Sequence, residues 1–256
     1  GQLNCLVGDT SITVTQLVVA VDGLSVVSKS GGAADVCMQN MGGMTAAQLR
    51  WVFSAETDSE LTTAGLDLSS VVPEDDGDGI KEWSDLSANC NADAIVLAYP
   101  DADSGTYEYF YEEILHEAAA GFGSGTQSAD DNVLVNALLA DENAIGYFGY
   151  AYYQENMATL GAVAVSNNHT HGIADAPEDA VAPTPQTVRD GTYAPLSRPL
   201  FMNVNNAAWD DVTPFLLWAF SGDGSAAISE VGYVPLDDAT YQEMIRRILA
   251  QGVYDA

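Results

Sequence analysis

The sequence predicts an α/β fold, and two observations support that prediction. Short apolar runs alternate with segments whose apolar residues recur at helical spacing, and polar turns separate the two kinds of segment. Hydrophobic residues make up 47% of the 256 residues, which is enough to form a sizeable core in one large domain or in two lobes. Alternating strands and helices of this kind pack in layers around a sheet.

Each predicted element follows from its local pattern. Residues 13–27 form a long β-rich run, and residues 94–99 are a short apolar run typical of a buried strand. The other predicted elements are helices over 45–54, 106–119 and 214–221, a helix that Asp130 or Asp131 caps and that extends to 140, a helix over 238–251, and strands over 144–151, 162–165 and 200–204.

Charge excludes several classes of partner. The chain has 37 acidic and 7 basic residues, a formal net charge of −30. Such a surface repels nucleic acid and anionic membranes. It suits a saline environment, where salt screens the repulsion between carboxylates. Any anion that binds would depend on local hydrogen-bond donors, because the field of the whole molecule opposes its approach.

The most informative segment is the turn between the predicted strand at 94–99 and the helix that follows it. Ser104, Gly105 and Thr106 occupy the expected helix N-terminus, where unpaired N–H groups and the helix dipole favour an anion. Their hydroxyls are uncharged donors, and Asp103 is placed to orient the turn or to accept a hydrogen bond. The alternative is that Ser104 or Thr106 simply caps the helix.

An acidic loop forms a second candidate site. Calcium takes about six to eight oxygen ligands, which loops supply from alternating positions around a glycine. The sequence resembles the calcium loops of EF-hand and dockerin modules, although Glu occupies the first position and Lys81 the eighth. The ligand positions are filled by Glu74, Asp76, Asp78, Glu82 and Asp85. The alternative is a solvated acidic loop, and no other cofactor is expected.

Other polar motifs carry less information. Asn168 begins a pattern that accepts N-linked glycans, and His169 and His171 lie in the same expected loop, where two histidines alone are too few for a metal site. His116 is expected on the surface of a helix. Because no nucleophile and base occur in a recognisable setting, the sequence favours a protein without catalytic activity.

Several blocks together resemble one known family. The segment from Asp103 to Phe110, Asp-Ser-Gly-Thr-Tyr-Glu-Tyr-Phe, resembles the oxyanion-binding turn of the PstS family, the phosphate-binding proteins of ABC importers. Further blocks that match this family in order begin at Val19, Met44, Glu82, Asp130, Gly146, Pro195 and Glu230. The resemblance extends from about residue 19 to residue 248.

The resemblance implies a two-lobed periplasmic-binding-protein type II architecture, with the ligand between the lobes. Residues 1–22 would then be a remnant of lobe 1 and the crossover strand. Residues 23–165 would form lobe 2, with an acidic insertion near 56–90, and residues 166–256 the return to lobe 1 and its C-terminal part. The family's N-terminal part of lobe 1 has no counterpart here, so lobe 1 would be incomplete: either another polypeptide fills the gap, or the chain is a fragment, or lobe 1 has been rebuilt.

The cysteines are interpreted through the same resemblance. Cys37 and Cys90 flank the segment between the crossover strand and the strand at 94–99, and we expect them to form a disulfide. Cys5 is then left over, which motivates the hypothesis that a separate N-terminal polypeptide completes lobe 1 through this cysteine. Arg198 is expected to hold the return strand beside carboxylates rather than to contact ligand.

The expected function is that of an extracytoplasmic phosphate-binding protein, either a solute receptor that serves an ABC permease or a scavenger. Ser104, Gly105, Thr106 and Asp103 would supply half of the phosphate site. The alternative is a secreted protein that keeps the fold but has lost the phosphate site, and that has become structural, adhesive or calcium-binding.

Overall fold

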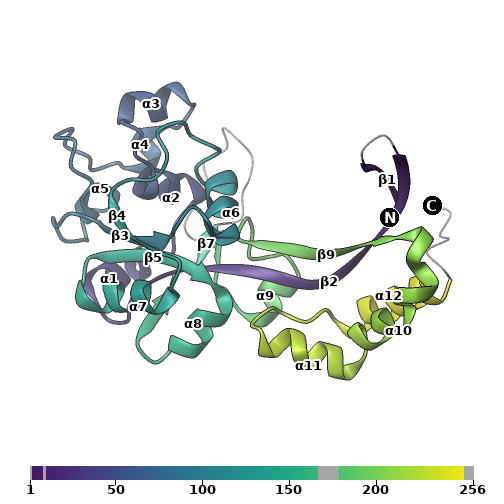
Figure 1. Cartoon of the computed structure of the whole chain (residues 1–256). Coiled ribbons are helices and arrows are strands. Elements are labelled where there is room, and N and C mark those ends of the chain that lie inside the picture. The colour runs from purple at the N-terminus through teal and green to yellow at the C-terminus, as the bar shows by residue number, and fades with distance from the viewer. Residues whose placement is uncertain (1, 8–9, 167–178, 251–256) are drawn as a thin grey trace. The chain divides into compact units, whose positions relative to one another are not determined.

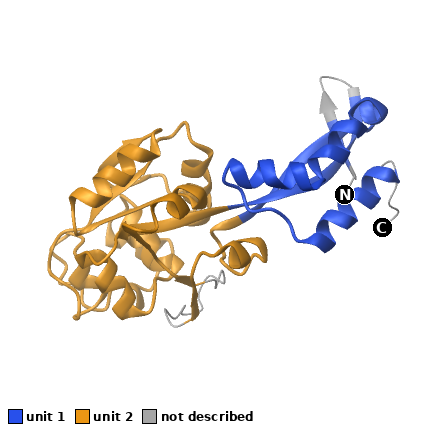
Figure 2. Cartoon of the chain, turned by 90° about the horizontal axis from the view of Figure 1, so that it is seen from below, with its two compact units in different colours: residues 1–22, 198–256 blue, residues 23–197 orange. Residues whose placement is uncertain are grey.

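The structure is a computed structural model that describes residues 2–7, 10–166 and 179–250. The chain divides into two compact units (Figures 1 and 2). Unit 1 comprises Gly1–Asp22 and Arg198–Ala256, and unit 2 comprises Gly23–Ser197. In the part of the chain that is described, no helix is both long and apolar enough to cross a membrane.

A mixed sheet forms the centre of unit 2. Strand β3 (Val96–Pro100) lies between β4 (Gly125–Ser128) and β5 (Ala144–Gly149) and is parallel to both. The end of the 20-residue strand β2 (Thr10–Lys29) pairs antiparallel with β5 and with β6 (Leu160–Ala162). The short strands β7 (Val165–Ser166) and β8 (Ala180–Val181) form a separate pair.

Helices and turns connect these strands. Their bounds are α1 (Ala33–Met41), α2 (Ala46–Phe53), α3 (Asp58–Thr63), α4 (Leu68–Val71), α5 (Trp83–Leu86), α6 (Gly105–Glu113), α7 (Asp131–Ala140), α8 (Tyr150–Asn156) and α9 (Pro185–Arg189).

Both faces of this sheet are apolar, as expected for strands covered on both sides. On one face, Ala98 and Phe148 pack with Leu134 and Leu138 of α7. Tyr147 points to the other face, because neighbouring residues of a strand alternate, and its ring stacks on Phe110 of α6 with 3.9 Å between centroids. Helices α6 and α7 therefore cover opposite faces of the sheet.

Unit 1 consists of the beginning of β2 and the C-terminal quarter of the chain. The elements added here are β1 (Gln2–Val7), β9 (Ser197–Asn205), the 3₁₀ turn η2 (Asn206–Ala208), α10 (Trp209–Ala219), α11 (Gly222–Glu230) and α12 (Asp238–Leu249). Both β1 and β9 pair with β2. The buried indole of Trp209 donates to the carbonyl of Ile248 at 3.2 Å, which holds α10 against α12.

Cap residues place several helices where the sequence predicts them. Thr45 caps α2 through a capping box, in which its hydroxyl accepts from the Gln48 N–H and the Gln48 side chain accepts from the Thr45 N–H. Asp130 caps α7 by accepting from the Asn132 N–H at 3.0 Å. Arg198 forms an ion pair with Asp22 at 3.3 Å, so the expected tie between the return strand and a carboxylate is confirmed.

Three predicted elements have the wrong bounds. The helix predicted over 106–119 ends at Glu113, and His116 and Glu117 then adopt positive φ values of 53° and 54°. The strand predicted over 144–151 ends at Gly149, where α8 begins. The helix predicted at 214–221 begins earlier, at Trp209, and contains Pro214 in its interior.

The return strands also differ in their roles. The predicted strand at 162–165 corresponds only to the ends of β6 and β7, which both lie inside unit 2. The predicted strand at 200–204 lies within β9, which begins at the last residue of unit 2 and continues into unit 1. Ser166 and residues 179–197 thus belong to unit 2, whereas the assignment of these segments to lobes stays a prediction.

Candidate functional site

The candidate site lies at one edge of the sheet in unit 2. Because β3, β4 and β5 are parallel, their carboxyl ends meet at the same edge. Helix α6 begins beyond β3, α7 beyond β4 and α8 beyond β5. Ligands of open α/β sheets bind at this edge, where loops and helix N-termini converge. The turn predicted from the sequence follows β3, the central of the three strands.

Asp101 shapes this turn. Its side-chain carboxylate accepts from the Asp103 N–H at 3.2 Å, and its backbone carbonyl accepts from the Ser104 N–H at 3.1 Å. Asp103 stays a prediction, either as a residue that orients the turn or as a hydrogen-bond acceptor, and the described contacts that shape the turn include those of Asp101. The Asp103 side chain is exposed at the entrance to the helix.

Ser104 is the N-cap of α6. Its hydroxyl oxygen accepts from the Thr106 N–H at 3.1 Å, so the capping alternative is confirmed at this residue. Capping does not use the hydroxyl hydrogen, which can still be donated to an anion. Ser104 and Thr106 are half-buried and Gly105 is exposed, so the first turn of α6 is accessible from solvent.

Aromatic side chains fix α6 behind this turn. Phe110 contacts Phe53 with 4.9 Å between ring centroids, in addition to its stack on Tyr147. Tyr107, in the first turn, packs on Phe122 at 4.6 Å. The hydroxyl of Tyr109 donates to the carbonyl of Pro195. Tyr109 and Phe110 are therefore part of the core, and these contacts fix α6 in unit 2.

Asp131 also lies at this edge, where the sequence predicts Asp130 or Asp131 as the cap of α7. It is the first residue of α7 and is half-buried. Burial and the neighbouring carboxylate of Asp130 raise the pKa of Asp131 to about 6. The sequence shows the two adjacent aspartates, but the raised pKa of Asp131 also requires burial, which depends on the fold.

The acidic loop is organised around its own backbone. Asp75 accepts from the Gly77 N–H at 2.9 Å, Asp76 from the Asp78 N–H at 3.0 Å, and Asp78 from the Ile80 N–H at 2.7 Å. Within residues 2–7, 10–166 and 179–250, no group of three or more His, Cys, Asp or Glu side chains is arranged to hold a metal ion. A calcium site formed by Glu74, Asp76, Asp78, Glu82 and Asp85 stays a prediction.

Lys81 anchors this loop to α2. Its ammonium donates to the carbonyl oxygens of Trp51 and Ser54 at the C-terminal end of that helix, where unpaired carbonyls favour a cation. Burial lowers the pKa of Lys81 to about 8, while Asp58 and Glu56 act in the opposite direction. These residues line a cavity of about 500 Å³.

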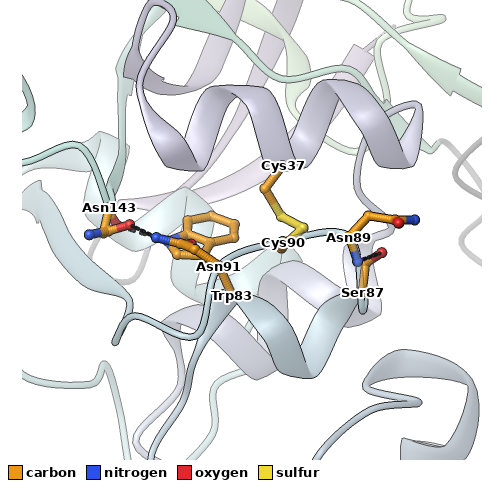
Figure 3. The surroundings of a disulfide bond; sticks show 7 residues. All are labelled: Cys37, Trp83, Ser87, Asn89, Cys90, Asn91 and Asn143. Atoms are coloured by element: carbon orange, nitrogen blue, oxygen red, sulfur yellow. Dashed lines mark hydrogen bonds between the residues drawn. A yellow bond between two sulfur atoms is a disulfide. The ribbon is translucent and has the colours of Figure 1, made fainter.

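The predicted disulfide is present. Cys37 of α1 is bonded to Cys90, with an S–S distance of 2.05 Å (Figure 3). Close to it, the Trp83 indole donates to the backbone carbonyl of Asn143 at 3.0 Å, and the Asn91 amide donates to the Asn143 side chain at 2.8 Å. Cys5 of β1 is a free, half-exposed thiol. Asn168, His169 and His171 lie outside the described residues.

Comparison with known proteins defines the family. Residues 7–223 match the model of the PBP superfamily domain, so the chain belongs to the PBP superfamily. It is 34% identical over 191 residues to protein SphX of Synechococcus elongatus, which covers 74% of this chain and 53% of SphX. It is 30% identical over 168 residues to the phosphate-binding protein PstS of Staphylococcus aureus, which covers 64% of this chain and 47% of PstS. The chain spans about half the length of these curated relatives.

Solved structures agree with this assignment. A possible phosphate binding protein from Planctomyces limnophilus matches with a TM-score of 0.70 and 28% identity, over 94% of this chain and 73% of that chain. An ABC-type phosphate transport receptor from Vibrio cholerae has the same fold, with a TM-score of 0.58 and 16% identity, over 91% of this chain and 78% of that chain. The expected α/β fold of the periplasmic-binding-protein type II class and the resemblance to PstS are confirmed.

Proposed function

We propose that the protein binds inorganic phosphate reversibly, without catalysis, outside the cytoplasm. The observation that carries this proposal is the accessible N-terminus of α6, where Ser104, Gly105 and Thr106 follow the central parallel strand. The Staphylococcus aureus relative is a phosphate-binding protein and the Vibrio cholerae structure is a phosphate transport receptor, so phosphate is the ligand that we propose.

The chemistry of this turn suits a tetrahedral oxyanion. The hydroxyls of Ser104 and Thr106 donate without adding charge, and the helix dipole favours the negative ligand. Asp103 would accept a hydrogen bond from a protonated phosphate oxygen and would repel fully ionised sulfate. Unit 2 would thereby supply one half of the site.

Substitutions of Ser104 separate phosphate binding from helix capping. Ser104→Asp keeps a good N-cap but places a negative charge at the anion position, whereas Ser104→Ala removes both the cap and the donor. A hydrogen bond to a charged group contributes about 1.5–3 kcal/mol, so we expect Ser104→Ala to weaken phosphate binding about tenfold to a hundredfold. Ser104→Asp should abolish binding without lowering the melting temperature. Isothermal titration with phosphate measures the affinity of each variant, and thermal unfolding measures its melting temperature.

Ser221 provides the matched control. It caps α11 of unit 1 by accepting from the Gly224 N–H at 3.4 Å, so Ser221→Ala removes an equivalent cap away from the turn. Phosphate affinity should be unchanged in this variant. If Ser104→Asp still bound phosphate as tightly as the unmodified protein, the turn would not be the binding site. If instead the unmodified protein bound no phosphate, the structural or adhesive alternative would be favoured.

We further propose that another polypeptide segment completes the lobe to which unit 1 belongs, that an ABC permease accepts the bound phosphate, and that the environment is saline. The free thiol of Cys5 and the partial coverage of the relatives support the first point. Mass measurement of natively isolated protein before and after reduction tests it. A disulfide-linked second peptide on Cys5 is expected, and an unmodified Cys5 thiol would argue against this linkage.

A further inference from the structure

The cavity beside Lys81 lies at the opposite edge of the sheet from the turn at Ser104. Ile95 immediately precedes β3 and Ser124 immediately precedes β4, so part of the cavity wall lies at the amino ends of these two parallel strands. The turn at Ser104 follows the carboxyl end of β3. The cavity is therefore separate from the proposed phosphate site.

Its size and lining are those of a small-molecule site. The volume of about 500 Å³ falls within the usual range for such sites, which is about 300–1,000 Å³. Most of the wall is apolar, with a few polar groups among the apolar side chains, as is typical of ligand pockets. The apolar lining residues include Trp51, Val52, Ile80, Ile95 and Leu97. Thr57 and Ser59 also line the cavity and are exposed, so a small molecule can reach it from solvent.

Two opposite charges lie around the indole of Trp51. The ammonium of Lys81 lies 5.4 Å from the ring centroid, and the carboxylate of Asp58 accepts from the indole N–H at 3.2 Å. The described side chains of Lys81 and Asp58 form no direct ion pair with each other, and each is held by other groups. These contacts fix a positive and a negative group at the cavity before any ligand binds, which lowers the entropy cost of binding.

Each of these two groups keeps hydrogen-bonding capacity for a ligand. The ammonium of Lys81 has three N–H groups and donates to two backbone carbonyls, which leaves one donor. Among the described residues, Asp58 accepts a hydrogen bond only through Oδ1, which leaves Oδ2. Glu56 also lines the cavity, but Arg50 already pairs with it at 2.9 Å and balances its charge.

The charges of the lining discriminate between classes of ligand. Asp58 and Asp75 repel a simple anion such as phosphate, and Lys81 repels a simple cation. A zwitterion meets both requirements, because its carboxylate can accept from Lys81 while its ammonium donates to Asp58.

We propose that this cavity is a second binding site, which takes a small zwitterion of the amino acid class. The ligand carboxylate accepts the remaining N–H of Lys81, and the ligand ammonium donates to Oδ2 of Asp58. The apolar wall contacts the rest of the ligand. This site works independently of the turn at Ser104.

Isothermal titration of the whole chain with each of the twenty standard amino acids tests the proposal. We expect at least one of them to bind. The amine that lacks the carboxylate of that amino acid, and the acid that lacks its amino group, should each bind at least tenfold more weakly, because each loses a hydrogen bond between charged groups.

Substitutions at the two charged groups provide the second part of the test. Asp58→Asn keeps an oxygen that can accept from the Trp51 indole, so the variant should fold, yet its affinity for the amino acid should fall at least tenfold. Lys81→Met should have a similar effect, and Asp58→Asn decides the matter if Lys81→Met does not fold.

Asp237→Asn is the matched control. Asp237 caps α12 in unit 1 by accepting from the Thr240 N–H at 2.9 Å, so this substitution removes a hydrogen-bonded carboxylate away from the cavity. It should leave the affinity for the amino acid unchanged, as should Ser104→Asp and saturating phosphate.

Two results would overturn the proposal. One is that no standard amino acid binds at about 10 mM, a concentration well above a millimolar dissociation constant. The other is that the amine alone binds as tightly as its parent amino acid, because Lys81 would then take no part. Neither result bears on phosphate binding at Ser104, which is measured separately.

Discussion

At the scale of single residues, Lys81 shows how burial changes the response to pH. Its ammonium lies among backbone carbonyls and beside the indole of Trp51, 5.4 Å from the ring centroid. These contacts favour the charged form, but burial removes water from the ammonium and outweighs them. The folded protein holds a proton on this amine less tightly than the unfolded chain does, with a pKa of about 8 against the ordinary 10.5. Between those pH values the unfolded state binds more protons, so the free energy of unfolding increases with pH.

We predict that raising the pH from 7 to 9.5 stabilises the protein. The shift corresponds to an upper bound of about 3 kcal/mol for this group. Lys81→Met should remove most of the pH dependence, and urea unfolding at both pH values measures it. Lys29→Met is the control, because Lys29 forms only an exposed ion pair with Glu142 at 3.4 Å. An equally steep pH dependence in Lys81→Met would show that other groups cause it.

At the scale of elements, the acidic loop is held together against its own charge. Burial raises the pKa of Asp85, and the nearby carboxylates of Asp75, Glu82 and Asp76 raise it further. A divalent cation would relieve this repulsion. In the structure, the carboxylates of Asp75 and Asp76 accept hydrogen bonds from the backbone of the loop.

We therefore predict that calcium raises the melting temperature more than magnesium does at equal concentration. Calcium at a hundred times its dissociation constant would add about 2.7 kcal/mol of stability. The double substitution of Asp76 and Asp78 by Asn should remove the difference between the two cations. Asp67→Asn, which changes an exposed cap of α4, should preserve it. Equal melting temperatures in calcium and magnesium would leave a solvated loop as the correct interpretation.

Local signals explain which elements could be predicted from the sequence. Thr45 with Gln48, and Asp130 before an apolar run, specify the starts of α2 and α7 through hydrogen bonds to the adjacent backbone. The turn at Ser104 was predicted for the same reason. The disulfide and the family depended on the resemblance rather than on any local pattern.

The elements predicted with wrong bounds begin or end where local patterns do not specify the boundary. The apolar run 144–153 suits a strand or a helix equally, and only pairing with β2 and β3 limits the strand to Ala144–Gly149. Pro214 suggested a helix start, yet α10 contains it in its interior. The end of α6 is set by His116 and Glu117 in the left-handed region, which non-glycine residues seldom adopt.

At the scale of the whole molecule, the net charge of −30 governs both stability and binding. Few cations balance the carboxylates, and buried pairs such as Arg50 with Glu56 at 2.9 Å are local exceptions. Added salt shortens the range of repulsion, from about 10 Å at 0.1 M to about 3 Å at 1 M.

We predict that sodium chloride raises the melting temperature steadily over this range. The association rate of phosphate should also rise with salt, because the field of the protein opposes the anion. Stopped-flow measurements at several salt concentrations test this, with potassium chloride as the control for ion identity. An association rate that fell with salt would indicate a positive local field at the turn, contrary to the expectation.

The path of the chain has a consequence for how this protein can be recombined. Unit 2 is one continuous segment, whereas unit 1 is assembled from the two ends of the chain. The Leu24 N–H donates to the Leu196 carbonyl at 2.9 Å, so the two ends of unit 2 lie side by side. A segment whose two ends lie close together can replace the corresponding segment of a homologue without disturbing the rest of the fold. Unit 2, with the turn at Ser104, could thus be exchanged between homologues as one segment with two junctions, so its half of the proposed site could be inherited separately from unit 1.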